Sequence, residues 1–238
     1  MIVLVASDTP KYMKKEHDRY SYLENLKVLL HSMKRLGIHT TEKAVIHLMN
    51  CNKEEDKDIK NIYPNSEILH SYNTQDGAEI LLYKTVRLQI PTISNILEKN
   101  LDDHVFFIDT DMIVNRDFRH LLDNNKNDSF IKIWHRREKK AETHKLQKSF
   151  FLLPNTKTVR KAVLFWKEYA DSCMEWYGDQ LGLYVAIKKY NIDIINIGNS
   201  YTDMHFNSNS YLWHCKKRYN VEPWKSVYNS YLKEIYEK

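Results

Sequence analysis

The sequence feature that most constrains the fold is a short apolar run that ends in two acids. Residues 105–115 read VFFIDTDMIVN. The first four residues favour a buried β-strand, and Asp109 and Asp111 follow it at once. In α/β sheets, ligands bind at the carboxyl ends of the strands. Because buried carboxylates are costly unless they are paired or metal-bound, the run predicts a core strand that ends in a ligand site.

A second pair of acids with the same spacing shows why the context matters. Asp56 and Asp58 lie in NKEEDKDIKN, a polar and charged run, which predicts a solvated helix face or a loop. Acids are common in this chain, so one such pair is expected by chance. The alternative for Asp109 and Asp111 is a turn with a helix cap. Their position after a β-favouring run favours the ligand site.

Apolar strands alternate with helices through the first half of the chain. The predicted strands, besides the one that ends at Asp109, cover residues 2–6, 44–49 and 67–69. The predicted helices cover residues 20–36, 53–62 and 79–98, and Pro91 interrupts the last of them. This alternation predicts an α/β fold with a mostly parallel central sheet flanked by helices.

The second half of the chain continues with strands and helices and shows no domain boundary. Its predicted strands cover residues 131–134, 149–153 and 192–197, and its predicted helices cover residues 157–172 and 179–190. Residues 135–145 are expected to form an exposed loop. The chain has no repeat, low-complexity linker or Pro/Gly-rich break, so a single domain over residues 1–238 is predicted.

The composition narrows the classes of ligand and location. A net charge of +5 suits an anionic ligand without indicating nucleic acid. Cys51, Cys173 and Cys215 form no close-spaced metal motif, which indicates a reducing compartment, so a cytoplasmic protein is expected. No apolar run approaches the ~20 residues that span a membrane, and MIVLVASD lacks the basic start of a signal peptide. Membrane contact, if any, is expected to be peripheral.

The basic run HRREKK covers residues 135–140. Such a run is usually a solvated loop, which is the expectation here. Nucleic acid or an anionic acceptor would be the alternative ligands.

The segment from residue 81 to residue 118 carries a family resemblance. It reads LLYKTVRLQIPTISNILEKNLDDHVFFIDTDMIVNRDF and resembles the core of GT-A glycosyltransferases, most closely glycosyltransferase family 8. Such proteins carry a Tyr-x-x-Arg-Leu-x-x-Pro helix and then an apolar strand that ends in a metal-binding Asp-x-Asp. Arg87, Leu88 and Pro91 match the helix here, and residues 105–114 match the strand.

Four further segments resemble the family, in the same order along the chain. VLVASD is similar to the opening nucleotide-binding strand, SFFLLPN to the strand after the acceptor loop, YGDQLGLYVAI to the helix that lines the sugar site, and WHCKKRYNVEPW to the terminal metal-binding segment. That last segment runs His-x-x-Gly-x-x-Lys-Pro-Trp in the family, whereas here the Gly and Lys are missing and Glu222 precedes Pro223. The second Asp of the sugar-site helix is also absent.

The resemblance implies a metal-dependent glycosyltransferase with a GT-A, Rossmann-like sheet. It would move a hexose from a nucleoside-diphosphate sugar, UDP-linked, to a hydroxyl group of a saccharide or another acceptor, with retention of the anomeric configuration. Residues 1–115 would bind the nucleotide, whereas residues 116–238 would bind the acceptor and supply the C-terminal metal-binding segment. Nucleic acid is not an expected partner.

The resemblance also implies a set of metal ligands and donor contacts. Asp109, Asp111 and His214 would hold the ion, and mixed carboxylate and imidazole ligands suit Mn²⁺, with Mg²⁺ as the alternative. The expected donor contacts are Ala6, Ser7, Asp8, Tyr12, Arg87, Asp109, Thr110, Asp111 and Lys217. Tyr20 and Tyr22 are alternatives for stacking on the base, and Lys216 and Arg218 for binding the diphosphate. Otherwise His214 is a packed or surface side chain, and Arg87 forms a helix salt bridge.

The expected catalytic residues are Asp179 and Gln180. The resemblance implies that Gln180 lies near the reactive face of the donor sugar. An inverting enzyme would instead need a general base, for which Asp179 is the candidate. Asp179 also stands where a helix is predicted to begin, so an N-cap is its structural alternative.

Two other functions stay open. FFIDTD resembles the nucleophile strand of haloacid-dehalogenase-type phosphatases, and Gly178-Asp179 is similar to their later metal motif, although the usual Gly is replaced by Met112. A non-catalytic module that binds nucleotide sugars is the other alternative.

Overall fold

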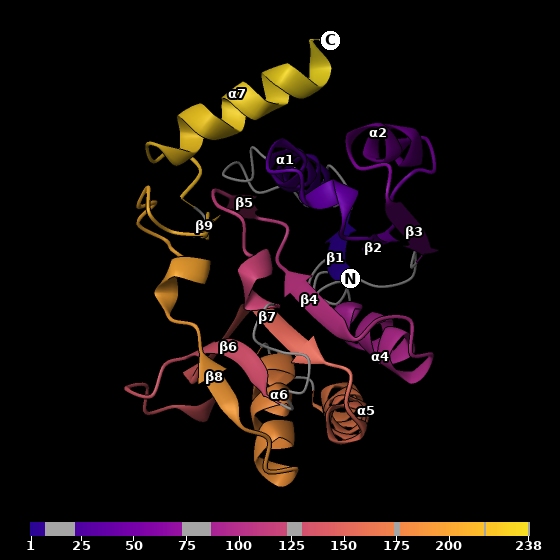
Figure 1. The fold of residues 1–238 in the computed structure, drawn as a ribbon, viewed down its shortest axis with the longest axis vertical. Helices are drawn as coiled ribbons and strands as arrows, with labels where there is room; N and C mark the ends of the chain where they lie inside the picture. Colours follow the sequence, from indigo (N-terminus) through magenta and orange to yellow (C-terminus); the bar gives the residue numbers. More distant parts are fainter. Residues whose placement is uncertain (8–21, 73–86, 123–129, 174–176, 217, 238) are drawn as a thin grey trace.

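The computed structural model of the protein describes residues 1–7, 22–72, 87–122, 130–173, 177–216 and 218–237. Seven strands of this described part form the central sheet, in the order β3-β2-β1-β4-β7-β6-β8 (Figure 1). They are β1 (Ile2–Ser7), β2 (Ala44–Met49), β3 (Ser66–Ser71), β4 (His104–Ile108), β6 (Ile131–His135), β7 (Leu146–Pro154) and β8 (Ile194–Asn196). A separate two-stranded sheet pairs β5 (Met112–Val114) with β9 (Leu212–His214).

The central sheet is mostly parallel, as predicted. The pairs β1–β2, β2–β3, β1–β4 and β6–β8 run parallel, whereas β7 runs antiparallel to both of its neighbours, β4 and β6. The strand predicted to end at Asp109 is β4, and the strands predicted elsewhere match the observed ones to within a few residues.

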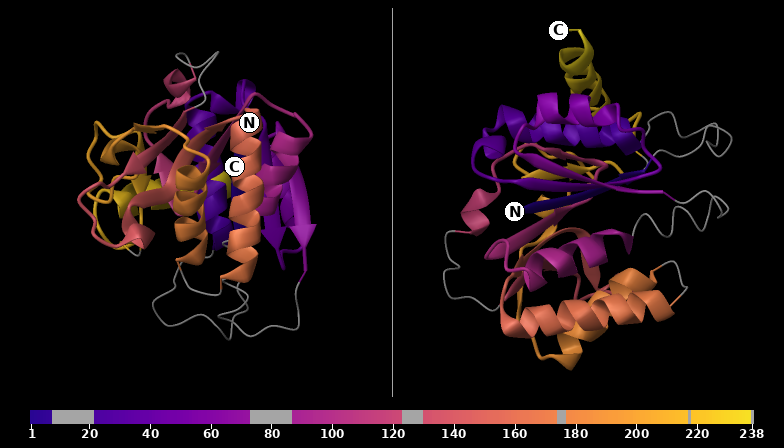
Figure 2. Two further views of the ribbon diagram at one scale, coloured as in Figure 1. Left: turned by 90° about the horizontal axis from the view of Figure 1, so that it is seen from below. Right: turned by 90° about the vertical axis from the view of Figure 1, so that its right-hand side faces the viewer.

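Helices cover both faces of the sheet. They are α1 (Tyr22–Arg35), α2 (Glu55–Ile62), α4 (Gln89–Glu98), α5 (Lys157–Ser172), α6 (Gly178–Lys189) and α7 (Trp224–Tyr236). The right-hand view of Figure 2 shows α1 and α2 on one side of the sheet and α4, α5 and α6 on the other. In the described part of the chain, each helix is too short or too polar to cross a membrane.

The two faces follow from the alternation of side chains along each strand. In β4, Phe106 and Ile108 join the core beneath α1 and α2, whereas Val105 and Phe107 join the core against α4, α5 and α6. Successive residues of β4 therefore belong to different cores. Because both faces of β4 are covered, the acids that follow it emerge from the centre of the fold.

One expectation about secondary structure is confirmed and one needs correction. The helix predicted over residues 79–98 is interrupted in its described part, because Arg87 is helical, Leu88 is a turn residue and α4 begins at Gln89 with Pro91 in its first turn; residues 79–86 lie outside the described residues. No element is predicted after residue 197, yet β9 and α7 form there.

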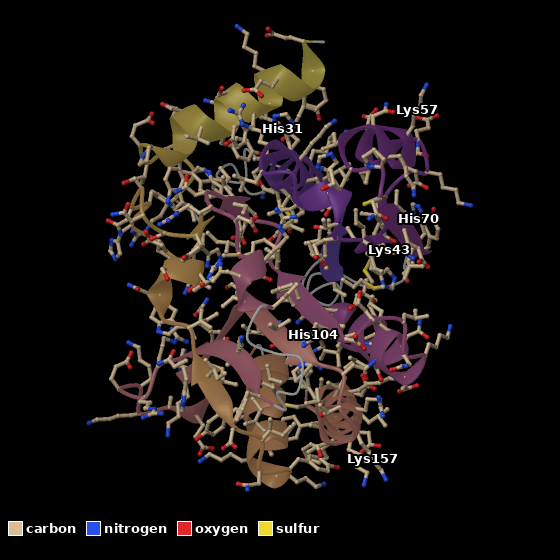
Figure 3. The ribbon with its side chains drawn as sticks, in the orientation of Figure 1. His31, Lys43, Lys57, His70, His104 and Lys157 are labelled. Atoms are coloured by element: carbon tan, nitrogen blue, oxygen red, sulfur yellow. The ribbon has the colours of Figure 1, made fainter. Side chains whose placement is uncertain are left out.

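The C-terminal segment packs on α1 through a third apolar cluster. Trp213, Trp224 and Tyr228 contact Val28 of α1 and Ile113 of β5 in this cluster. A side-chain contact adds to this packing, because His31 Nε2 lies 2.9 Å from Glu234 Oε2 of α7. Figure 3 labels His31 on α1, next to α7. The segment that carries His214 is therefore fixed to the first half of the chain at both ends.

Replacing Trp224 should therefore destabilise the protein. Its side chain is 1% exposed, and its ring centroid lies 5.6 Å from that of Phe206 and 6.1 Å from that of Tyr228. We expect Trp224→Ala to lower the free energy of unfolding by about 3–5 kcal/mol, because truncating a buried aromatic side chain loses burial and leaves a cavity. Urea denaturation measures the change. Val221→Ala, at an exposed position nearby, should change it by less than about 0.5 kcal/mol, and equal effects would contradict the packing described here.

Candidate functional site

Asp109, Asp111 and His214 meet at the carboxyl edge of the central sheet. Asp109 directly follows β4, and its main-chain N–H donates to the carbonyl oxygen of Ser149 across 2.8 Å. Asp111 precedes β5, which pairs with β9 so that Met112 faces His214. One potential ligand atom from each of the three residues lies within 4.8 Å of the others. The structure thus brings together the three residues that the sequence suggests as metal ligands.

Main-chain hydrogen bonds hold His214 in place. Its N–H donates to the carbonyl oxygen of Asp203 across 2.8 Å, and the N–H of Cys215 donates to the carbonyl oxygen of Asp111 across 2.9 Å. The buried Asp203 carboxylate in turn accepts hydrogen bonds from the N–H groups of His205 and Asn207, at 2.8 and 2.7 Å, and from Ser210 Oγ at 2.8 Å. Asp203 therefore organises the loop from which β9 starts.

The electrostatics of the three side chains are those of two carboxylates crowded against one imidazole. Burial and the neighbouring Asp111 raise the pKa of Asp109, against an opposing effect of Lys148. Burial also acts to raise the pKa of Asp111, but the charge and hydrogen bond of His214 outweigh it and the pKa is lowered. Burial acts to lower the pKa of His214, but Asp111 and Asp109 raise it overall.

This donor set fits a divalent metal ion. His214 Nε2 lies 3.2 Å from Asp111 Oδ1, and no hydrogen-bond partner for the buried Nδ1 of His214 occurs among the described residues. An ion that replaced the proton on the imidazole would neutralise the two carboxylates and satisfy a ring nitrogen. Mixed oxygen and imidazole ligands suit Mn²⁺ and, more weakly, Mg²⁺.

A buried ion pair lies beside this cluster. Lys148 Nζ donates to Asp179 Oδ2, and the two side chains are 8% and 9% exposed. The same ammonium lies 5.6 Å from the centroid of the Phe107 ring, and its charge lowers the pKa of Asp109. Lys148 thus stands between Asp179 and the metal-ligand candidates. Sequence reasoning missed it; the signal is a lysine inside a strand run that is otherwise uncharged, LQKSFFLLP.

A bulge explains how Lys148 reaches this position. β7 pairs with β6 as Ile133–Phe151 and then as Trp134–Gln147, so extra residues of β7 oppose a single step of β6. Bulges change the face to which the following side chains point and are common beside functional sites. Leu146 and Phe151, which regular alternation would place on opposite faces, accordingly join the same core cluster.

The start of α6 differs from the N-cap alternative for Asp179. Tyr177 occupies the cap position, and Asp179 lies one residue inside the helix, where its Oδ1 accepts from the N–H of Gln180 across 2.8 Å. Its other oxygen pairs with Lys148, because a buried carboxylate needs a counter-charge. The Gln180 side-chain amide donates to the carbonyl oxygen of Thr143.

Arg87 supports the same helix. Its guanidinium donates to the carbonyl oxygens of Ala170 and Cys173 at the carboxyl end of α5. It also limits the space at Gly178, where an added Cβ would lie 2.9 Å from Arg87 Nη2 and 2.7 Å from Cys173 Sγ. Arg87 is therefore placed next to the Gly178-Asp179 turn, and these two hydrogen bonds go to main-chain carbonyl oxygens.

The remaining predicted residues divide into two groups. Ala6 and Ser7 end β1, at the same sheet edge as Asp109, and Thr110 is buried between the two acids. Asp8, Tyr12 and Lys217 lie outside the described residues. Tyr20 also lies outside them, and Tyr22 is an exposed residue at the start of α1.

Two observations complete the site. Tyr219 was not predicted to take part, yet burial and the nearby Asp111 raise its pKa. The comparison acids Asp56 and Asp58 lie on α2, where they pair with His70 and Lys27. Their prediction as a solvated helix face, away from the site, is confirmed.

The Asp203 carboxylate makes an acid-dependent contribution to stability. Burial would raise its pKa, but the hydrogen bonds from His205, Asn207 and Ser210 lower it overall. The unfolded state therefore binds the proton more readily, so the stabilisation is present above the ordinary Asp value, about 3.9, and is lost as the pH falls through the lower folded pKa. Asp203→Asn should cost about 1.5–3 kcal/mol at pH 7, and the gap from wild type should close in acid.

Urea denaturation from pH 7 to pH 2.5 measures this difference. Asp103→Asn, at an exposed position, serves as the control and should follow the wild-type curve at every pH. A gap between wild type and Asp203→Asn that stayed constant with pH would contradict the ionised, hydrogen-bonded carboxylate.

Several solved structures similar to this one are glycosyltransferases, although no protein-family model and no curated protein matches the sequence. The chain is 12% identical to an active-site mutant of LgtC, with a TM-score of 0.61. The match covers 98% of this chain and 95% of the LgtC chain. It is 12% identical to the bifunctional glycosyltransferase WbbM, with a TM-score of 0.57, and the match covers 100% of this chain but only 44% of the WbbM chain. It is 14% identical to GlyE of Streptococcus pneumoniae TIGR4, with a TM-score of 0.52, and the match covers 98% of this chain and 63% of the GlyE chain. The likeness shows that this chain has the fold of these glycosyltransferases, as its GT-A resemblance predicts.

Proposed function

We propose that the protein is a metal-dependent glycosyltransferase similar to family 8. It transfers a hexose from a nucleoside-diphosphate sugar, UDP-linked, to a hydroxyl group of a saccharide or another acceptor. The observation that carries the proposal is the cluster of Asp109, Asp111 and His214, whose ligand atoms lie within 4.8 Å of one another. The cluster lies at the carboxyl edge of a sheet whose fold is shared with glycosyltransferases, and one of these, LgtC, is described as a galactosyltransferase in complex with donor and acceptor sugar analogs.

The two acids and His214 would bind Mn²⁺, with Mg²⁺ as the alternative. When bound, the ion supplies positive charge to the diphosphate that leaves the sugar. Asp111 is the central ligand of the proposal, because it lies next to His214 and near Tyr219. Ala6, Ser7 and Thr110 lie at the same edge and would contact the nucleotide, and Asp8, Tyr12 and Lys217 are proposed contacts outside the described residues.

Lys148 and Asp179 favour a reaction with retention over one with inversion. An inverting enzyme needs a base that takes a proton from the acceptor. Protonation of Asp179 would break its ion pair and leave the buried Lys148 ammonium without its partner, which typically costs about 3–5 kcal/mol. Gln180 carries no such penalty, and its amide is oriented by Thr143. Gln180 is therefore the residue proposed to face the reacting sugar, while Arg87 and Lys148 position the turn.

We also propose a cytoplasmic location. Cys51, Cys173 and Cys215 form no disulfide with one another in the described structure, and a reducing compartment keeps cysteines in that state.

The metal ligands are tested by binding measurements on single variants. Asp111→Ala and His214→Ala should each weaken the joint binding of Mn²⁺ and UDP by at least about tenfold, because each removes a ligand or its charge from the site. Calorimetric titration of Mn²⁺ with UDP gives both affinities. Affinity should also fall as the pH drops through the raised pKa of His214, because only the neutral imidazole binds metal.

Asp58→Ala is the matched control, since Asp58 belongs to the other Asp-x-Asp and pairs with Lys27 on the far side of α1. It should leave Mn²⁺ and UDP binding unchanged. A loss in Asp58→Ala, or unaltered binding in Asp111→Ala, would refute the proposed site. Release of phosphate from phosphoester substrates would favour the phosphatase alternative, and binding of a nucleotide sugar without turnover would favour the non-catalytic module.

The stereochemical outcome tests the assignment of Asp179. The first-formed product should keep the anomeric configuration of the donor sugar, because the Asp179 carboxylate is already engaged as the buried partner of Lys148. Proton NMR of the product, recorded before mutarotation, reads the configuration directly. An inverted product would give Asp179 the role of base and exclude the likeness to a retaining family.

A further inference from the structure

A cavity of 280 Å³ lies between α6, β6 and the start of β8, away from the metal-ligand cluster. Its lining includes His135, Arg137, Tyr184, Lys188, Asn191 and Asp193. The elements that enclose it lie together at the lower end of the molecule in Figure 1. Its volume is at the small end for ligand sites, so it suits one chemical group of a ligand better than a whole ligand.

Positive charges converge on this cavity. Lys145 Nζ lies 5.7 Å from the centroid of the Tyr184 ring, and Lys188 Nζ lies 5.6 Å from the same centroid. Burial lowers the pKa of His135. The charges of Arg137, Lys145 and Lys188 lower it further, so all three cations are near the His135 imidazole.

The converging cations are not balanced by ion pairs in the described part of the chain. Among the described residues, no ion pair joins Arg137, Lys145 or Lys188 to an acid. Two acids, Asp193 in the lining and Glu138 nearby, leave the neighbourhood net positive. Like charges held close together raise the free energy of a folded protein, and a bound anion would relieve that repulsion.

One stripe of α6 leads from the cavity to the proposed catalytic residue Gln180. Tyr177, Gln180, Tyr184 and Lys188 follow one another at spacings of three or four residues, so they lie along one stripe of the helix. The loop before β7 borders this stripe, because Thr143 accepts the hydrogen bond from Gln180, and His144 lies 4.9 Å from Tyr177 between ring centroids. Tyr177 is 45% exposed. From Gln180 to Lys188 the helix rises roughly 12 Å.

We propose that this cavity binds an anionic group, a phosphate or a carboxylate, that the acceptor carries roughly 12 Å from its reacting hydroxyl. The arginine offers a planar fork for two oxygens, and the lysine and the Asn191 amide offer further donors. Tyr177 and His144 would cover the sugar rings in between. The anion site rests on the cavity and its charges alone, whereas its assignment to the acceptor rests on the proposed function.

Two double variants with the same net charge test the site. Arg137→Gln/Lys188→Gln removes two cations from the cavity. Lys139→Gln/Lys189→Gln removes the two neighbouring cations; both are exposed, and Lys189 Nζ lies over the Phe165 ring instead, 3.7 Å from its centroid. Calorimetry at low ionic strength measures the binding of inorganic phosphate and of glucuronate to each protein, with glucose as the neutral probe. Near-identical melting temperatures of the two doubles establish that both are folded.

Phosphate or glucuronate should bind wild type and the Lys139/Lys189 double alike, and at least about tenfold more weakly to the Arg137/Lys188 double, since charge-assisted hydrogen bonds are lost. The anion that binds more tightly names the group. Equal weakening in the two doubles, or no binding of either anion to wild type, overturns the proposal. Mn²⁺ and UDP titrated into the same samples separate the two claims: if they fail to bind while phosphate or glucuronate binds, the glycosyltransferase assignment is lost and the anion site stands.

Discussion

The candidate site depends on the antiparallel pairing of β5 with β9. This sheet of two three-residue strands joins the strand that follows Asp111 to the strand that ends at His214, so two segments far apart in the sequence share one set of hydrogen bonds. The main-chain hydrogen bonds from His214 to Asp203 and from Cys215 to Asp111 hold the imidazole of His214 beside the carboxylates of Asp109 and Asp111. The apolar cluster around Trp213 and Trp224 supports the pairing from behind. Without the pairing of β5 with β9, Asp109 and Asp111 would be an acidic turn at the end of a core strand.

Part of this arrangement follows from local sequence patterns. The apolar run before Asp109 forms β4, the alternation of strands and helices gives the mostly parallel sheet, and the polar context of Asp56 and Asp58 places them on α2. These features depend on residues close together in the sequence, where side-chain periodicity is informative. The order of the family-like segments also predicted that His214 would come near the acids.

The missed features depend on contacts between distant segments. Lys148 reaches Asp179 because β7 bulges against β6, and no periodicity in LQKSFFLLP reveals where pairing shifts. Tyr219 lies near Asp111 because β9 folds back along β5. Asp179 was a plausible cap from sequence, but its burial beside a lysine made an ion pair the more favourable use of the carboxylate. In α7, Trp224 and Tyr228 are the fully buried aromatic residues. Two aromatic residues are too short a pattern to predict the helix from sequence, because their burial depends on packing against α1.

The single reversed strand in the central sheet has a consequence for how this fold can diversify. Since β7 runs against β6, the two form a hairpin whose connecting loop, residues 136–145, starts and ends at the same sheet edge. The ends of that loop are clamped by the His135–Leu146 pair and by the bond from the Arg136 N–H to the Lys145 carbonyl oxygen, 2.7 Å long. Lengthening a loop between fixed ends costs little, since the closure entropy grows only with the logarithm of its length. Exchange of this one hairpin loop would thus let the scaffold acquire new specificity while every strand register and both apolar cores stay as they are.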